Sequence, residues 1–431
     1  MTGIRQSFLI SLEAGDEFSK GKCPTYKWVA PPPGSYFNST HNRQTSRIQS
    51  AGSKYWDTVA YGNLTGQWDW TFTLDYKYLT PLLMVFDKYE THKVNANRVD
   101  VNGDSYWGYR YTFSKENNGR VPSFTVRRKI LNYMAGGPVY SDEMVELRGC
   151  VCKNFRFTKS EGSSQVNVTM TGFYTDEKMI TGELPNTDYQ EYSGKLVEWM
   201  CMFISDDGSS YDYVANTDNL GLSVENNAGA VYNVCSPFAK SYFEGLSDFS
   251  FTTSCYSNNP DKYKKRLYFG GDKGWTGSTS NPTDQPLTVM PAAKGLKPLS
   301  HIKLVSYSGS CRNSTNAGCS NPFGFDNIPS SDERMDITID DCVIKSLTWP
   351  KGNGGMIQDT ISSAECKRVS VTVYIKGAYI EFRPSEADVI HSVDTTMSAY
   401  ADPVNDIERS SRGCPQPPQE ELEPTSEPGN T

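Results

Sequence analysis

The chain has 431 residues, of which 37% are hydrophobic and 12% aromatic, including 26 Tyr. That length suffices for two or three domains with real cores, and the aromatic bias favours strands over helices. The formal net charge of −8 argues against tight nucleic-acid binding, because gripping phosphates requires a basic surface.

The cysteines indicate a reducing environment. There are 11 of them, they are scattered, and no C-x-x-C pair occurs. We interpret them as buried free thiols in the cytosol rather than as a disulfide framework. The opening "MTGIRQSFLISLEAGDEF" lacks the pattern of a secretory signal, and no apolar run reaches the ~18 residues of a membrane span. We expect no membrane insertion.

The first predicted element is a strand within residues 1–12, with Ile4, Phe8, Ile10 and Leu12 on one face and Leu9 breaking the alternation. Residues 20–53 follow, polar throughout and with three consecutive prolines. A stretch of this length without clear periodicity is typical of a functional loop or a disordered segment.

The clearest strand signal is "QWDWTFTLDY" (67–76). Trp68, Trp70, Phe72 and Leu74 alternate with polar residues, which is the period of a half-buried strand. The alternation then stops. Pro81 stands where a first helical turn tolerates proline, and Thr80 can cap it, so we predict a short helix covering the sheet.

Further strands are predicted along the rest of the chain. Asn102-Gly103 indicates a hairpin turn within 98–114. Residues 123–131 and 146–175 predict three more strands, with a Gly-Ser turn between the last two. The basic run 127–129 is interpreted as an exposed sheet edge. Residues 176–195 lose the pattern, which indicates a domain boundary, and strand patterns restart at 196–204, 220–234 and 248–256.

Internal similarity is the most informative feature. "GCVCKNFRF" (149–157) matches "DCVIKSLTW" (341–349), "VNVTMTGFY" (166–174) matches "VSVTVYIKGAY" (369–379), and "DWTFT" (69–73) matches "DFSFT" (248–252). The matches are collinear and their offset only grows. This predicts a tandem duplication with loop insertions in the second copy. The predicted domains are 1–195, with a long N-terminal arm or loop at 20–53, and 196–408. An acidic, Pro-rich tail at 409–431 is expected to be disordered.

The sequence offers little chemistry. The four histidines, His41, His92, His301 and His391, lie in no metal-binding motif. Asp100, Asn102 and Asp104 start like a calcium loop, but Ser105 and Tyr111 replace its essential Gly and Glu. The pairs Asp206/Asp207 and Asp340/Asp341 are adjacent, so on a strand their side chains point to opposite faces. We therefore expect no catalytic, cofactor-binding or metal-binding residue, and no enzyme.

One family resemblance emerges from these patterns. "SAGSKYWDTVAYGNLTGQWDWTFTLDYKYLTPLLMVF" (50–86) resembles the first half of a tail tube domain of long-tailed bacteriophages. "LRGCVCKNFRFTKSEGSSQVNVTMTGFY" (147–174) resembles the closing hairpin of that domain, and "IDDCVIKSLTWPKGN…KRVSVTVYIKGAY" repeats it. The resemblance covers most of 50–175 and, more weakly, 230–385. It departs most at 258–295, where no covering helix is evident.

The resemblance implies a fold and a role. The fold would be mainly β, with two tandem tail-tube-like β-sandwich or barrel domains, each with a short covering helix, plus long loops. Three chains would close a pseudo-hexameric ring, and stacked rings would form the tail tube through which DNA is ejected. Partners would be other copies of the chain, a tape measure protein and tail terminator or baseplate proteins. The chain would be made in the bacterial cytoplasm and end in the virion tail.

Within that reading, the long loops would be arms that order on the neighbouring ring. Polar residues such as Asp340 and Asn167 are candidates for the lining of the channel, which DNA would pass without specific binding. One alternative is another virion or surface β-protein that binds a receptor or carbohydrate. Another is a hydrolase whose carboxylates come together from distant positions.

Overall fold

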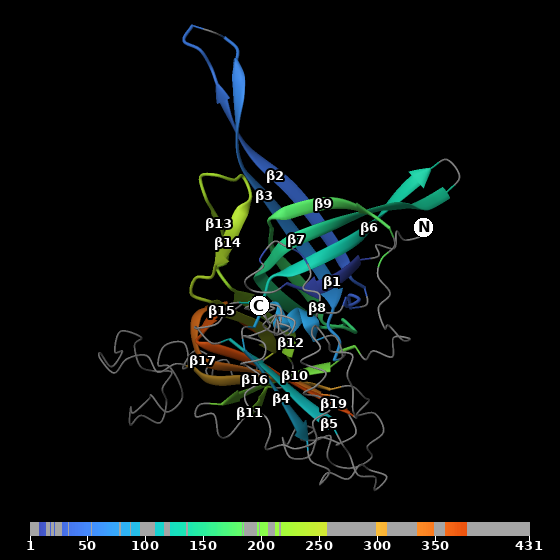
Figure 1. Ribbon diagram of the computed structural model, residues 1–431. Coiled ribbons are helices and arrows are strands. Elements are labelled where there is room, and N and C mark those ends of the chain that lie inside the picture. Colours follow the sequence, from blue (N-terminus) through green and yellow to red (C-terminus); the bar gives the residue numbers. More distant parts are fainter. Residues whose placement is uncertain are drawn as a thin grey trace, which may run out of the picture.

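In a computed structural model the protein is mainly β, with one short helix among the described residues (Figure 1). The structure describes residues 8–94, 108–182 and 196–256, each with short internal gaps, and residues 299–307, 334–348 and 358–376. Every strand pair found within these ranges is antiparallel. The expected mainly β fold is confirmed.

The N-terminal half is organised around one long strand, β7, which takes part in two sheets. Its N-terminal part pairs with β6 and β9, and its C-terminal part pairs with β8 and β12. The elements of this half are β1 Phe8–Leu12, β2 Tyr36–Ile48, β3 Thr58–Thr73, α1 Thr80–Leu83, β4 Lys88–Val94, β5 Gly108–Ser114, β6 Phe124–Met134, β7 Gly137–Ser160, β8 Asn167–Tyr174 and β9 Asp176–Thr181.

The C-terminal half has the same kind of long strand, β17, again shared between two sheets. Its N-terminal part pairs with β16 and β19, and its C-terminal part pairs with β18. The elements of this half are β10 Trp199–Ser205, β11 Asp212–Val214, β12 Thr217–Glu225, β13 Gly229–Tyr232, β14 Ala239–Phe243, β15 Asp248–Tyr256, β16 Leu299–Tyr307, β17 Arg334–Thr348, β18 Gln358–Cys366 and β19 Arg368–Lys376.

The pairing order of the first half recurs in the second. One sheet runs β2-β3-β8-β7 and its counterpart runs β12-β15-β18-β17. The other sheet runs β1-β6-β7-β9 and its counterpart β10-β16-β17-β19. Each strand of one set therefore has a counterpart at the same position in the other.

The recurrence extends to backbone detail at the bend of each long strand. Gly149 (φ 61°) and Asp341 (φ 54°) both take a left-handed conformation, which glycine and aspartate tolerate best. The cysteine that follows each of them is fully buried. The residue directly after β8 and the residue directly after β18 make the same backbone hydrogen bond. The Thr175 N–H donates to the Arg148 carbonyl at 3.0 Å, and the Lys367 N–H donates to the Asp340 carbonyl at 3.1 Å.

A β-bulge also recurs in the hairpin that follows the bend. It falls at Lys153 in β7 and at Lys345 in β17, the two lysines that the sequence match had aligned. From the bend to the start of the next strand, the two halves have the same number of residues. The match of 166–174 with 369–379 required a loop insertion between residues 349 and 369, and this expected insertion is therefore wrong.

One of the three sequence matches joins strands that are not counterparts. Residues 167–174 form β8, which lies between β3 and β7, whereas residues 369–376 belong to β19, which lies between β17 and β5. The counterpart of β8 is β18. The match was wrong because alternating Val and Thr residues suit any half-buried strand.

A second match found the correct strands with the wrong register. β3 and β15 are counterparts, but their register differs from the predicted one. Phe251 lies opposite Ala364, which in turn lies opposite Ile344. In the same way, Trp68 lies opposite Gly172, which lies opposite Cys152. Trp68 therefore corresponds to Phe251, four positions away from the predicted alignment. Both rings are buried.

A further pair of counterparts escaped the sequence comparison. "FLIS" (Phe8–Ser11) in β1 and "MFIS" (Met202–Ser205) in β10 occupy the same ladder position, since Ile10 lies opposite Val126 and Ile204 opposite Ile302. Ser11 and Ser205 are both 2% exposed. Four residues are too few to stand out by sequence alone.

Local predictions had mixed outcomes. Trp68, Trp70, Phe72 and Leu74 are all buried, as the alternation predicted. The short helix exists as α1 and holds Pro81 in its first turn, but its N-cap is Leu79 and no side chain caps it, so the expected Thr80 cap is wrong. The predicted turn at Asn102-Gly103 and the C-terminal tail lie outside the described residues.

Three segments were assigned wrongly. Residues 36–48, expected as loop, form β2, and residues 176–181, expected as a patternless boundary, form β9. Both strands have mostly exposed or half-exposed side chains, so no hydrophobic period marks them. The basic run 127–129 is not at a sheet edge, because β6 pairs with β1 on one side and β7 on the other.

Candidate assembly interface

The two halves are joined edge to edge by backbone pairing. Residues Asn154–Ser160 of β7 pair antiparallel with Asn219–Glu225 of β12. The last strand of one sheet thereby meets the first strand of its counterpart, and β2-β3-β8-β7 continues into β12-β15-β18-β17. We call this contact the internal junction.

Buried polar contacts fix the internal junction. The Asn226 N–H donates to the carbonyl of the bulged Lys153 at 2.8 Å. The Asn226 side-chain amide donates to the carbonyls of Val85 and Cys152, each at 3.3 Å. Asn226 is fully buried, and its side-chain N–H groups have the acceptors that buried donors need, although its Oδ1 has no hydrogen-bond partner. These hydrogen bonds hold the end of β12 against the bulge of β7.

A second set of contacts joins the halves away from the internal junction. Strand β5 of the first half pairs with β19 of the second. Beyond β5, Lys115 Nζ lies 2.9 Å from Glu244 Oε2, with the two side chains 3% and 7% exposed. Glu244 also accepts a hydrogen bond from the Val121 N–H at 2.6 Å. Removing one partner of such a buried pair leaves an uncompensated charge, so the halves are tied to one arrangement.

Two strand edges are left without a neighbour in the described part of the chain. There, β2 pairs only with β3, and the Val343–Thr348 part of β17 pairs only with β18. These strands are the counterparts of β12 and β7, the two strands that form the internal junction. A sheet edge presents unpaired N–H and C=O groups, which is a template for another chain.

The β2–β3 hairpin also projects far beyond the sheets as an arm (Figure 1). Large side chains stand exposed on it, with Tyr55 at 79% and Tyr61 at 66% exposure. The Arg43 guanidinium lies over the Tyr61 ring, 4.5 Å from its centre. Exposed aromatic surface of this kind marks interaction sites.

A second, shorter hairpin, β13–β14, lies beside the arm (Figure 1). The Leu64 N–H donates to the Pro237 carbonyl at 3.0 Å, and Tyr232 Oη donates to the Leu64 carbonyl at 3.2 Å. This hairpin lies between β12 and β15 in the chain. The arm occupies the equivalent place, because β2 and β3 are the counterparts of β12 and β15. The β13–β14 hairpin also exposes apolar side chains, including Val234 and Phe243.

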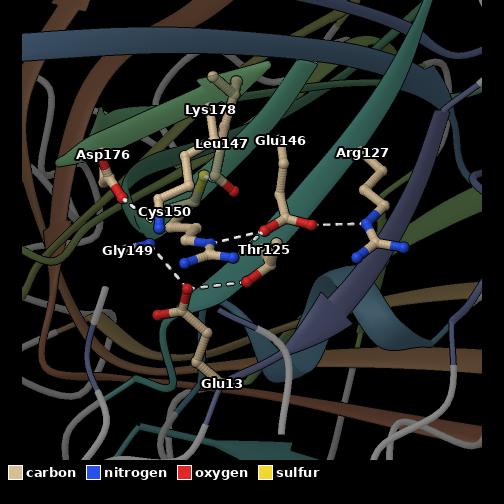
Figure 2. A network of polar contacts seen from close by, with 10 residues as sticks. Glu13, Thr125, Arg127, Glu146, Leu147, Gly149, Cys150, Asp176 and Lys178 are labelled. Atoms are coloured by element: carbon tan, nitrogen blue, oxygen red, sulfur yellow. Dashed lines mark hydrogen bonds and ion pairs between the residues drawn. The ribbon is translucent and has the colours of Figure 1, made fainter. Parts of the chain in front are cut away.

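A buried carboxylate holds the bend of β7 (Figure 2). Glu13 is fully buried and accepts hydrogen bonds from Ser123 Oγ at 2.9 Å, Thr125 Oγ1 at 2.8 Å and the Gly149 N–H at 2.8 Å. Three donors are what a buried carboxylate needs to offset its desolvation. The segment after β1 is thereby fixed to the point where β7 passes between the two sheets.

A second carboxylate lies next to it (Figure 2). Glu146 accepts from Arg127 Nε at 2.6 Å and lies 2.5 Å from Arg148 Nη2. Burial raises the pKa of Glu146, but the hydrogen bonds and charges of the two arginines outweigh it and hold this pKa below its ordinary value. The cluster is an internal brace between β6 and β7.

The residues considered for catalysis do not form one site. His41 Nδ1 lies 2.9 Å from Glu177 Oε2, and His301 Nδ1 lies 2.5 Å from Asp340 Oδ1. The two pairs come from different halves of the chain. Asp341 stands at the bend of β17, and Asn167 is exposed at the start of β8. Within the described ranges, no group of His, Cys, Asp or Glu is placed to hold a metal ion.

The other residues considered are not described. They are the side chain of His92, the calcium-like residues 100–105, the pair Asp206/Asp207 and His391, which lie outside the described part of the structure. None of the helical structure within the described residues has the length and apolar composition needed to cross a membrane.

Comparison with known proteins adds no identification. No protein-family model matches the chain, and no curated protein matches it significantly.

Sequence reasoning missed the internal junction and the two edges that have no strand neighbour in the described part of the chain. Strand β12 alternates well enough to be predicted, but its partner in another sheet depends on long-range pairing that periodicity does not encode. The one available signal was the shared Lys of the bulge, Lys153 and Lys345, which marks the two counterpart edges.

Proposed function

We propose that the chain is a structural virion protein, built from two tandem copies of a tail-tube-like domain, that assembles into stacked rings forming a phage tail tube. The first copy lies within 1–195 and the second within 196–408. The recurrence of strand order, bend and bulge supports the duplication. The resemblance of residues 50–86 and 147–174 to tail tube domains supports the class of protein.

The observation that carries the proposal is the internal junction. Within one chain, β7 of the first copy pairs with β12 of the second. In the ladders of the described residues, the edge of the second copy that matches β7 lies on β17 and pairs only with β18, and the edge of the first copy that matches β12 lies on β2 and pairs only with β3. A neighbouring chain on each side would fill these two edges by repeating a contact that the fold already makes, which is head-to-tail assembly.

The internal junction also predicts the register between chains. Asn154 lies opposite Glu225, and Arg156 lies opposite Ser223. The ladders make Ser346 the counterpart of Asn154 and Asn42 the counterpart of Glu225. Ser346 of one chain would therefore lie opposite Asn42 of the next, and Thr348 opposite Thr40.

Head-to-tail pairing either closes into a ring or grows as a fibre. The resemblance implies three chains, six copies and a closed ring with no free edge. The net charge of −8 suits a channel that DNA must pass without sticking. A tape measure protein and tail terminator or baseplate proteins are the partners that this role implies, and no enzymatic activity belongs to it.

Cysteine cross-linking tests the register. The variant Ser346→Cys/Asn42→Cys places a thiol on each predicted edge, where both side chains are exposed. Mild oxidation should link separate chains into dimers and trimers on a non-reducing gel. The control Ser346→Cys/Ser46→Cys moves one thiol about 13 Å along β2 at ~3.3 Å per residue, and should not link. A positive control, Asn154→Cys/Glu225→Cys, should link within one chain.

The possible results of these experiments distinguish the tail tube proposal from its alternative. Equal linking of the two inter-chain variants, or none in a chain that forms rings, would refute the register. A stable monomer that binds glycans or cell surfaces would favour the receptor-binding alternative instead.

A further inference from the structure

Two cysteines meet across the hairpin of the second copy. The Sγ atoms of Cys342 in β17 and Cys366 in β18 lie 2.6 Å apart, well inside the usual contact distance of two sulfurs. Both are free thiols in this structure. Val343 lies opposite Glu365, so one step along the antiparallel ladder Cys342 lies opposite Cys366. Directly opposed residues on antiparallel strands have the Cα separation that a disulfide accepts.

Their surroundings differ in a way that suits a reaction. Cys342 is fully buried just after the bend at Asp341, and its thiol also lies 3.8 Å from the Ile339 carbonyl. Cys366 is partly exposed at the end of β18. Reagents in solution therefore reach Cys366 first, and Cys342 only through it.

The first copy lacks this pair. The counterpart of Cys342 is Cys150, likewise buried after a bend, with its thiol 3.8 Å from the Leu147 carbonyl. The counterpart of Cys366 is Tyr174, whose hydroxyl donates to Glu177 at 3.0 Å. The same position thus holds a hydrogen-bonded tyrosine in one copy and a second thiol in the other.

We propose that Cys342 and Cys366 form an oxidisable dithiol, closed to a disulfide by a small disulfide oxidant such as oxidised glutathione. The inference rests on the side-chain geometry and does not depend on the tail tube proposal. The six cysteines whose side chains are described are all free thiols, but only Cys150, Cys152 and Cys342 are buried as expected, whereas Cys201 and Cys366 are partly exposed and Cys235 is exposed.

The reaction proceeds by two exchanges. The Cys366 thiolate attacks one sulfur of the oxidant, forming a mixed disulfide and releasing one small thiol. The Cys342 sulfur then attacks the Cys366 sulfur, breaking the mixed disulfide and releasing the second small thiol. The two cysteines are oxidised by two electrons, the oxidant is reduced, and the two thiol protons end on the released thiols.

The electrostatics agree with this order. The hydrogen bond to Cys366, burial and the negative charges of Asp340 and Asp341 raise the pKa of Cys342 well above its usual range. A thiol with a raised pKa is a poor first nucleophile. Cys342 therefore acts as the nucleophile only in the second step. There, the mixed disulfide on Cys366 places the sulfur to be attacked in contact with it.

The disulfide would lock β17 to β18 at the bend. Its stabilisation comes from restricting the unfolded chain, and it is added to strands that are already paired. The oxidised protein should therefore melt at a higher temperature than the reduced protein.

The test treats the folded, full-length protein with oxidised glutathione, blocks free thiols and maps the peptides by mass spectrometry. The expected product is one peptide pair, joined through Cys342 and Cys366 with the loss of two hydrogen atoms, and a raised melting temperature. Cys366→Ser should lose both the link and the shift. Cys235→Ser, which removes an exposed thiol elsewhere, should keep both.

Two results would overturn the proposal. One is glutathione that remains on Cys366 without closure while circular dichroism shows the native fold. The other is the absence of any reaction at Cys366 under conditions that modify the exposed Cys235.

Discussion

Single residues determine how closely neighbouring strands pack. Gly172 in β8 lies where an added Cβ would overlap the Val151 carbonyl oxygen and the Trp68 ring. The first is backbone and the second is a buried ring whose Nε1 donates to the Phe173 carbonyl at 3.0 Å. Neither can move without breaking the sheet.

We therefore predict that Gly172→Ala lowers the free energy of unfolding by about 3 kcal/mol. The control Gly162→Ala sits in an open turn with φ 73° and no atom near the added Cβ, and should cost about 1 kcal/mol. Urea denaturation followed by tryptophan fluorescence measures both. Equal losses would contradict the close packing of β7, β8 and β3.

The Glu146 brace predicts a pH dependence. The pKa of Glu146 is lower in the folded chain than its ordinary 4.5. A carboxyl of this kind contributes stability above its unfolded pKa and loses it as the pH falls through its folded pKa. Glu146→Gln should cost about 2 kcal/mol at pH 7. The difference in the free energy of unfolding between Glu146→Gln and the unmodified protein should decrease below pH 4.5. A difference that is constant with pH would show that the carboxylate charge is not involved.

Residue types predicted some of this and not the rest. The alternation in 68–74 identified the buried rings because a half-buried strand has a period of two. The environment of Glu13 could not be predicted, because Ser123, Thr125 and Gly149 reach it only through the pairing of β1, β6 and β7. Nothing local in the sequence encodes that pairing.

At the scale of elements, the proposed rings would have to contact one another, and the arm is the clearest candidate for that contact. Its strands pair from Tyr36/Thr71 out to Ile48/Thr58, yet most of its outer side chains are exposed. An isolated two-stranded ribbon is marginal in water. The exposed aromatic side chains are the surface that a partner would bury.

Shortening the arm tests that role. Replacing Arg43–Leu64 by Asn-Gly joins Asn42 to Thr65, which already lie opposite each other, through a favoured two-residue turn. We predict rings that form but do not stack, seen by electron microscopy, with little change in melting temperature. Tyr55→Ser/Trp56→Ser keeps the backbone and should weaken stacking if the aromatic rings are the contact. Normal tubes from the shortened chain would exclude the arm.

The elements that sequence reasoning missed share one property. β2 and β9 carry few buried side chains, so they show no hydrophobic period although they are paired strands. The confusion of β19 with β8 has the opposite origin, because both show a good period and the pattern does not identify a strand's neighbours. Periodicity predicts that a segment is a strand, and tertiary pairing decides where it lies.

At the scale of the whole molecule, the account depends on one contact used twice. The internal junction joins the two copies of one chain, and the same junction would join each chain to the next. This proposed repetition would account for the edges on β2 and on the outer part of β17, which have no strand neighbour among the described residues and which an isolated protein would protect against uncontrolled pairing.

The most direct measurement is negative-stain electron microscopy of the purified chain together with its mass in solution. The account predicts rings or tubes with threefold symmetry, pseudo-sixfold walls and an open channel, and a solution mass in multiples of three chains. A monomer that persists at high concentration, in the presence of preformed rings or tail tips as initiators, would contradict it.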